Sequence, residues 1–292
     1  MASAAATGDS GFISPLAPVR VSGGVSITIA RRDERSVVTR LDERDGHKVR
    51  FPRGTSHPEA VLINTGGGLA GGDRIAHSVT LSEAARATVT TQASERVYRA
   101  PDAAATEMQV TLSLEAGSFL AWLPQETILF NRSRYHRCIT AHMAPGARLL
   151  LAETTVFGRT AHRETLTSCF LADQWRVYRD GALVAAEAVR LEGDVTAQLA
   201  TAAVGNDARV AATMMYFASD AEDRLTAVRR TIDPAREDTG ARAAPAVTMA
   251  ASAWRDRLVV RALASATQSM AQALAGVART LSGEDVPRVW WT

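Results

Sequence analysis

The sequence predicts a mainly β protein, built as a large stack or solenoid of short strands with a small C-terminal helical cap of about two helices. Apolar and polar residues alternate with a period of two from Val25 onward, which is typical of half-buried strands. Turn signals interrupt this alternation at short intervals as far as residue 191, and no repeat of fixed length is visible. Helical periodicity occurs only in the C-terminal part of the chain.

The first strands are predicted one by one from this alternation. Val25, Ile27 and Ile29 share one face of a strand. Residues 37–41 and 48–51 flank the dipeptide Asp45-Gly46, which predicts a hairpin turn between them. Residues 61–63 form a short apolar strand that leads into a glycine-rich loop, and residues 75–81 alternate again directly after it.

Further strands follow as far as residue 191. They are predicted at residues 87–91, 108–114, 119–123, 127–130, 135–143, 148–157, 166–171, 175–178 and 183–191. The dipeptide Asp180-Gly181 predicts a hairpin between the last two of them.

The C-terminal part adds the helices. Residues 221–231 predict a helix that ends at Asp233-Pro234, followed by a polar loop at residues 236–245 and a strand pair at residues 247–254 and 258–264. Ser265 and Gln268 form a capping-box signature for a last helix, which Gly283 closes. The apolar stripe of this helix consists of Met270, Leu274, Val277 and Leu281.

The domain organisation follows from the continuity of the strand pattern. The length of 292 residues permits one domain or two, and the pattern favours a single β domain over residues 21–292 after a disordered N-terminal lead-in at residues 1–20. Residues 1–11 lack the basic start and continuous apolar stretch of a signal peptide. Since no window approaches the roughly 20 apolar residues that span a bilayer, we expect a cytoplasmic protein without a membrane partner.

Charge and cysteine content exclude several classes. The chain has 33 basic and 31 acidic residues, a balance that argues against nucleic-acid binding and leaves protein partners. Arg132, Arg134 and Arg137 fit RNA contact, partner binding or surface ion pairing equally well. Cys138 and Cys169 are too few for a disulfide framework or a four-thiolate zinc site, as expected in a reducing cytosol.

The glycine-rich loop is the most distinctive local feature. It contains Gly66, Gly67, Gly68, Gly71 and Gly72. Its spacing satisfies G-x-G-x-x-G after a strand, which is the dinucleotide fingerprint. That fingerprint requires a following helix, but the next residues predict a strand. We therefore expect a tight turn that brings backbone close to backbone, and the alternative is an enzyme that binds NAD(P) at residues 66–71.

Three acidic residues lie where a carboxylate needs a partner. Asp73 ends the glycine loop, and is either presented into a cavity or bonded to nearby amides or to Arg74. Glu153 interrupts the apolar residues 149–152, and Glu187 follows Ala185-Ala186. Each of these two glutamates requires an arginine, a metal ion or water.

A second candidate metal site is local to one strand. His136, Cys138 and His142 share one face, and neighbours two apart on a strand lie roughly 6.6–7 Å from each other, within reach of a shared zinc, nickel or copper ion. The adjacent arginines would repel a cation, and a polar sheet face is the alternative. No Ser-His-Asp order with a nucleophile elbow and no His-Glu-x-x-His helix occurs, so the residues predict no catalyst.

Four further blocks occur in a fixed order along the chain: LINTGGGLAGGD at residues 62–73, TQASERVYR at 91–99, WLPQETILF at 122–130 and PRVWWT at 287–292. In this order they resemble the UreD (UreH) family of urease accessory proteins. The resemblance implies a mostly β-stranded, non-enzymatic maturation factor with two helices. It also implies assembly with a helical UreF partner and a nickel-carrying GTPase, UreG, and docking of the complex onto apo-urease for nickel insertion.

The resemblance further implies a nickel route through an internal tunnel. The tunnel positions carried over from the family are Asp73, Ser94, Glu153 and Glu187. Such oxygen ligands would hold nickel weakly and release it, so we expect transient nickel and no permanently bound cofactor. The face of His136, Cys138 and His142 is not carried over. A scaffold that binds urease without touching metal is the other interpretation.

Overall fold

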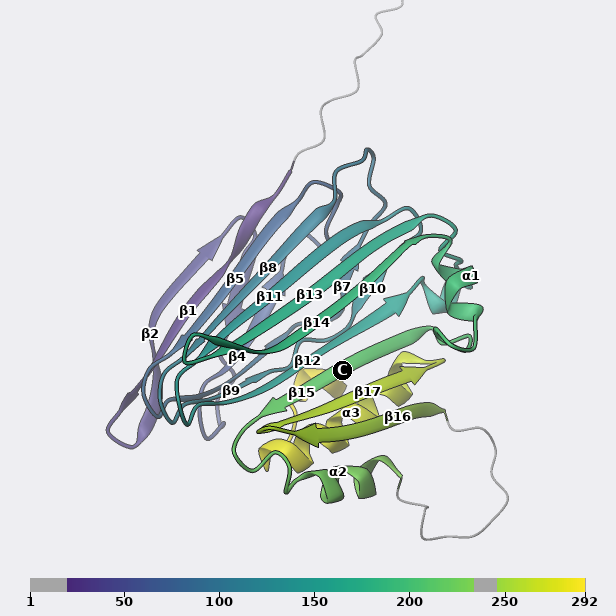
Figure 1. The fold of residues 1–292 in the computed structure, drawn as a ribbon. Coiled ribbons are helices and arrows are strands. Elements are labelled where there is room, and N and C mark those ends of the chain that lie inside the picture. Colours follow the sequence, from purple (N-terminus) through teal and green to yellow (C-terminus); the bar gives the residue numbers. More distant parts are fainter. Residues whose placement is uncertain (1–19, 234–245, 292) are drawn as a thin grey trace, which may run out of the picture.

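The computed structural model describes residues 20–233 and 246–291, and its strands form two facing sheets (Figure 1). The predicted lead-in, apart from residue 20, and the predicted loop at 236–245 lie outside the described residues. None of the described helices is long and apolar enough to cross a bilayer.

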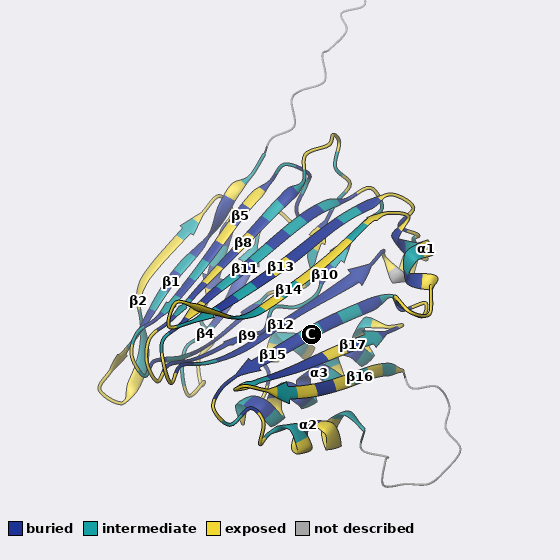
Figure 2. Cartoon of the chain, in the orientation of Figure 1, coloured by how far each residue is buried: buried dark blue, intermediate teal, exposed yellow. Residues whose placement is uncertain are grey.

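The first sheet has seven strands. Side by side they are β14 (Ala182–Gly193), β13 (Cys169–Arg179), β11 (Arg134–Met143), β8 (Thr106–Leu114), β5 (Arg74–Leu81), β1 (Ser22–Arg32) and β2 (Arg35–Arg44). The inner five strands run parallel, whereas the two edge strands, β14 and β2, pair antiparallel with their neighbours. Exposed residues concentrate on these two edges (Figure 2).

The second sheet has ten strands. Eight of them follow in the order β16 (Val247–Trp254), β17 (Arg257–Ala264), β15 (Val210–Phe217), β12 (Arg148–Phe157), β9 (Phe119–Trp122), β6 (Arg86–Thr91), β4 (Glu59–Asn64) and β3 (His47–Arg50). Beside β12 lies β10 (Thr127–Leu129), which also pairs with β7 (Glu95–Val97).

The chain passes repeatedly from one sheet to the other. The strands β4, β6, β9 and β12 belong to the second sheet, and β5, β8, β11 and β13, which alternate with them in sequence, belong to the first. Each turn therefore adds one parallel strand to each sheet. This arrangement confirms the predicted mainly β, solenoid-like stack.

Two cores hold the structure together. The larger one fills the space between the sheets and includes the fully buried Ile29, Leu112 and Leu149. The smaller one lies between the second sheet and two helices, α2 (Leu225–Ile232) and α3 (Thr267–Ser282). Burial of apolar area stabilises both cores by roughly 25 cal/mol per Å². Short elements complete the described fold: α1 (Val195–Ala200), η1 (Thr160–His162) and η2 (Arg288–Trp291).

The helical cap agrees with its apolar pattern but not with its predicted start. All four residues of the predicted stripe on α3 are buried, and Gly283 ends the helix with a left-handed φ of 74°. The capping box is wrong, because the extended Ala266 takes the cap position and no side chain bonds to the free amides. The helix α1, capped by Asp194, was not predicted.

One predicted hairpin is also wrong. Asp45-Gly46 does not join two paired strands, because β2 pairs with β1 in the first sheet and β3 pairs with β4 in the second. Val38 on β2 and Val49 on β3 thereby reach the same core from opposite sheets. The hairpin at Asp180-Gly181 is confirmed by the antiparallel pairing of β13 with β14.

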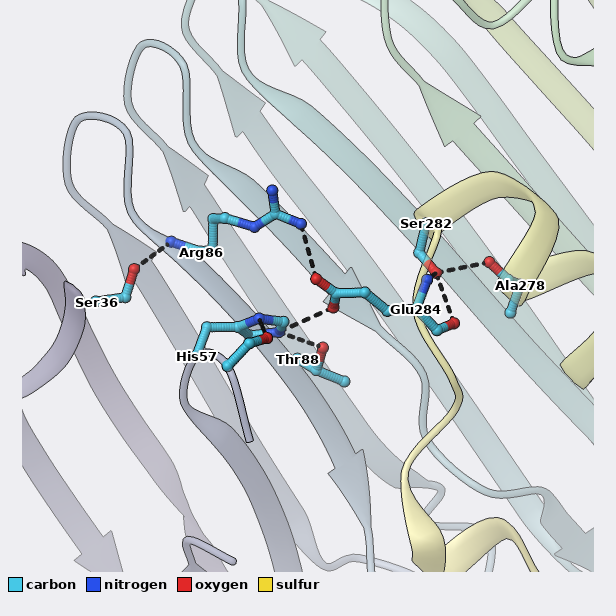
Figure 3. A network of polar contacts seen from close by, with 8 residues as sticks. Ser36, His57, Arg86, Thr88, Ala278, Ser282 and Glu284 are labelled. Carbon is cyan, nitrogen blue, oxygen red and sulfur yellow. Dashed lines mark hydrogen bonds and ion pairs between the residues drawn. The ribbon is translucent and has the colours of Figure 1, made fainter. Parts of the chain in front are cut away.

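The end of α3 is tied to the second sheet by a polar network (Figure 3). Glu284 accepts a hydrogen bond from Arg86 Nη2 at 3.0 Å and lies 3.5 Å from His57 Nε2. His57 also contacts Thr88 Oγ1 at 3.0 Å. The backbone nitrogen of Glu284 donates to Ser282 Oγ at 3.1 Å, which fixes the chain where it leaves the helix.

Candidate functional site

The glycine-rich loop is a tight turn between packed backbone segments. Leu69 N donates to Arg96 O at 2.7 Å, and Tyr98 N donates to Leu69 O at 2.8 Å. A Cβ atom on Gly68 would lie 2.4 Å from the Tyr98 ring, so only glycine fits there. The strand β5 follows the loop directly, as predicted. The fingerprint thus lacks the helix that would hold a pyrophosphate, which removes the support for the NAD(P) alternative.

Asp73 is held by amides at the end of this loop. Its side chain is buried, with Oδ1 accepting from Val21 N at 2.9 Å and Oδ2 accepting from Ala70 N at 2.7 Å. The carboxylate therefore closes the loop onto β1. Of the two roles weighed for Asp73, this geometry matches the bonding to nearby amides.

A polar pocket of about 150 Å³ lies beside the loop. Its walls come from both sheets and include Gly67, Gly68 and Ser94 together with His47, His77 and Glu95. His47 begins β3 in the second sheet, and His77 lies on β5 in the first. The two imidazole rings are 5.7 Å apart at an interplanar angle of 63°. Ser94 Oγ donates to Glu126 Oε1 at 2.6 Å.

Burial sets the charge states in this pocket. It lowers the pKa of His77 to about 3, with help from nearby His47 and Arg44, and it also lowers the pKa of His47. Both rings are therefore neutral at pH 7. Burial raises the pKa of Glu95 to about 7, although Asn64 Nδ2 donates to its two carboxylate oxygens at 3.1 and 3.2 Å.

A second, smaller cavity continues the polar interior toward the centre of the core. It has a volume of about 40 Å³ and shares the walls His77, Thr91 and Glu95 with the pocket beside the loop. Its deeper walls include Arg137 and Glu153. The two spaces therefore adjoin each other at three shared side chains, between the two sheets.

Glu153 belongs to a buried ion cluster that lines the second cavity. Arg137, only 2% exposed, bonds Glu153 through Nη1 and bonds Asp173 through Nε at 3.0 Å and Nη2 at 2.5 Å. Trp122 Nε1 donates to Glu153 and Trp175 Nε1 donates to Asp173, each at 2.9 Å. Burial raises the pKa of Glu153 to about 7. Arg137 opposes this rise, but it shares its single positive charge with Asp173, whose nearby carboxylate adds to the rise.

Glu187 lies apart from these cavities. It lines a groove of about 460 Å³ between β14 and the strands β15 to β17. There it forms a two-pronged ion pair with Arg261, at 2.9 and 2.5 Å. Of the predicted tunnel positions, Ser94 lines the pocket beside the loop and Glu153 lines the second cavity. Asp73 supports the loop next to the pocket, and Glu187 lies at the open edge of the stack.

The strand face of His136, Cys138 and His142 lies on β11. His142 stacks on Tyr178, with ring centroids 5.3 Å apart. Within residues 20–233 and 246–291, no group of three or more His, Cys, Asp or Glu side chains is placed to hold a metal ion. We therefore do not carry this face into the functional proposal.

Sequence reasoning did not select three polar residues of the interior: His47, His77 and Glu95. One signal was available for His77, because it shares the inward face of its strand with Ile75, Val79 and Leu81. A histidine on an apolar face needs a polar neighbour from another element. Sequence spacing could not show which element supplies it.

Comparison with known proteins finds one family that matches almost the whole chain. The profile of the UreD urease accessory protein family matches residues 21–291. Urease accessory protein UreD 1 of Methylobacterium radiotolerans is 43% identical over 253 residues, covering 86% of this chain and 84% of the relative. UreD 3 of Methylorubrum extorquens is 39% identical over 290 residues, covering 95% and 94%.

A third relative, UreD 1 of Brucella melitensis, is 38% identical over 284 residues, covering 95% of this chain and 96% of its own length. The similarity therefore extends over both sheets and the helical cap, and the matched proteins are accessory factors in urease maturation rather than enzymes. The chain belongs to the UreD family of urease accessory proteins.

Proposed function

We propose that the protein acts in the cytoplasm as a nickel-insertion chaperone for urease. It docks onto apo-urease together with a UreF-like helical protein and a UreG-like GTPase that carries nickel. The ion then passes through the polar interior between the two sheets. Nickel is the cargo of this reaction, and no cofactor stays bound to the chain.

The observation that supports this proposal is a set of polar side chains that line two adjoining cavities inside an otherwise apolar core. Buried polar groups cost free energy unless they are paired, so a fold selected for stability alone would replace them. Here His77, Glu95 and Glu153 line adjoining cavities between the sheets. Carboxylate oxygens bind nickel weakly enough to release it, which suits transfer rather than storage. Asp73, Ser94, Glu153 and Glu187 are the proposed passage residues.

The test of the whole proposal is urease loading with and without this chain. Urease subunits and the other accessory proteins are co-expressed, and the nickel content of purified urease is measured. We expect nickel-poor, inactive urease when the chain is missing. Equal nickel content in both preparations would show that the protein has no part in insertion.

Passage residues can be tested where substitution spares the fold. Asp73 and Glu153 are poor choices because each makes buried structural hydrogen bonds. Ser94→Ala removes one hydrogen bond to the Glu126 carboxylate and should cost at most roughly 1.5–3 kcal/mol of folding free energy. Glu187→Ala removes an ion pair whose Arg261 partner is 56% exposed, and should cost about 1 kcal/mol or less. We expect both variants to assemble normally and to load urease less well. Normal loading by both would speak against their role in passage.

A scaffold that binds urease without touching nickel is the second candidate. The observation in its favour is that both carboxylate oxygens of Asp73 and both of Glu153 already accept from protein donors. Nickel binding measured on the assembled accessory complex separates the two functions, because a pure scaffold adds no nickel to the complex when this chain joins it.

A further inference from the structure

One imidazole nitrogen in the pocket beside the glycine loop lacks a partner. His47 is 4% exposed, and its Nδ1 lies 3.2 Å from the carbonyl oxygen of Asp45. A carbonyl oxygen only accepts hydrogen bonds, so Nδ1 carries the proton of the neutral ring and Nε2 carries a free lone pair. Among the described residues, this buried Nε2 has no hydrogen-bond partner. Such groups are rare in folded proteins, and a bound ion would explain this one.

His77 lines the same pocket in the opposite tautomer. Its Nδ1 lies 3.2 Å from the backbone nitrogen of Val25. An amide N–H only donates, so this Nδ1 holds the lone pair and the neutral ring carries its proton on Nε2. His77 could coordinate a metal through Nε2 only by giving up the bond to Val25. Of two neighbouring histidines, therefore, only His47 presents a ready ligand atom.

The same pocket offers one carboxylate without an ion pair. Within the described residues, Glu95 accepts from the Asn64 amide and from the backbone nitrogen of Arg96 at 3.1 Å, and it makes no salt bridge. Each carboxylate oxygen has lone pairs beyond these contacts. An imidazole nitrogen and a carboxylate oxygen from residues that line one pocket form a donor set that suits nickel(II).

We propose that His47 Nε2 and the Glu95 carboxylate together bind a nickel(II) ion in this pocket, with water completing the coordination sphere, and that His77 is not a ligand. The choice of nickel rests on the function proposed above. Two protein ligands hold an ion loosely, in keeping with the lack of any three-residue metal cluster in residues 20–233 and 246–291. The site would hold nickel transiently, next to the second cavity.

A matched pair of variants tests the assignment on the full-length protein. Asparagine places a polar atom at the δ position of histidine and has none at the ε position. His47→Asn therefore keeps a donor toward Asp45 O, and His77→Asn keeps an acceptor for Val25 N, while both lose the ε nitrogen. Equilibrium dialysis against Ni²⁺ measures the dissociation constant, and circular dichroism checks the fold.

We expect His47→Asn and Glu95→Gln each to weaken Ni²⁺ binding at least about tenfold, and His77→Asn to change it by less than about threefold. Equal weakening by the two histidine variants would overturn the assignment, as would a wild-type protein whose pocket holds water only and binds no Ni²⁺. A wild-type protein that binds Ni²⁺ with unchanged affinity in His47→Asn would refute it as well.

A second measurement needs no variant. Nitrogen-15 NMR of the histidine rings reports which nitrogen carries the proton, and Zn²⁺ serves as a diamagnetic probe. We expect added Zn²⁺ to shift Nε2 of His47 and to leave the ring of His77 in its original tautomer; a coordination shift on His77 alone would contradict the proposal. Neither measurement involves urease. The assignment of His47 and Glu95 can therefore be refuted while the chain still proves necessary for urease loading, and it can hold while the chain proves unnecessary.

Discussion

Removing Arg137 tests whether the centre of the fold depends on one shared cation. Arg137→Met keeps most of the apolar stem but removes the guanidinium that bonds Glu153 and Asp173. Three hydrogen bonds to carboxylates are lost, and such bonds contribute roughly 1.5–3 kcal/mol each. Their sum is an upper bound, because an unpaired buried carboxyl group takes up a proton instead of staying charged.

We therefore expect Arg137→Met to lower the free energy of unfolding by about 3–5 kcal/mol, the usual cost of breaking a buried ion pair. That is a large part of the 5–15 kcal/mol typical of a folded domain. Urea denaturation followed by tryptophan fluorescence measures it, since Trp122 and Trp175 both contact the cluster.

A charge-free triple variant supplies the control. Arg137→Met combined with Glu153→Gln and Asp173→Asn leaves no buried charge, and we expect it to recover most of the lost stability. A single variant within about 1 kcal/mol of wild type would refute the reasoning. A triple variant as unstable as the single one would show that packing of the arginine stem, not charge, causes the loss.

Three further predictions follow from individual positions. Burial raises the pKa of Glu95 to about 7, so the folded state binds this proton more tightly than the unfolded state does, and the free energy of unfolding falls as the pH rises from about 4.5 to about 7. In urea denaturation, the free energy of unfolding of Glu95→Gln should exceed that of wild type by up to about 3 kcal/mol at pH 8 and equal it below pH 4.5. A difference that stays constant at all pH values would contradict this. Gly68→Ala should destabilise the protein more than Gly67→Ala does, because only a Cβ atom at residue 68 would overlap the Tyr98 ring and the Arg96 carbonyl oxygen. Gly67→Ala should cost about 1 kcal/mol, from its φ of +77° alone. Equal melting temperatures of the two variants would argue against close packing of the loop. Leu274→Ala, at a 2% exposed position of α3, should cost about 2–5 kcal/mol, and a loss below about 1 kcal/mol in urea denaturation would mean that the helical cap is not packed on the second sheet.

The accuracy of the sequence predictions depended on the range of the interaction concerned. The stripe on α3 and the hairpin at Asp180-Gly181 were predictable because residues a few positions apart determine them. The hairpin at Asp45-Gly46 was not, since the same turn dipeptide also fits a corner between two sheets. The alternation of β11 marks which residues face inward, but not that Arg137 meets Glu153 from the opposite sheet.

The sequence by itself determined the mainly β class, the glycine turn, the apolar faces and the family resemblance, because periodicity, turn chemistry and motif order are properties of the chain alone. Tertiary structure decided which sheet each strand joins, and with it which polar groups meet. His47, His77 and Glu95 lie on three strands, and only the pairing of β3, β5 and β7 within the two sheets brings them around one pocket. The physical reason is that a period of two fixes the direction of a side chain, whereas its partner depends on long-range strand order and register.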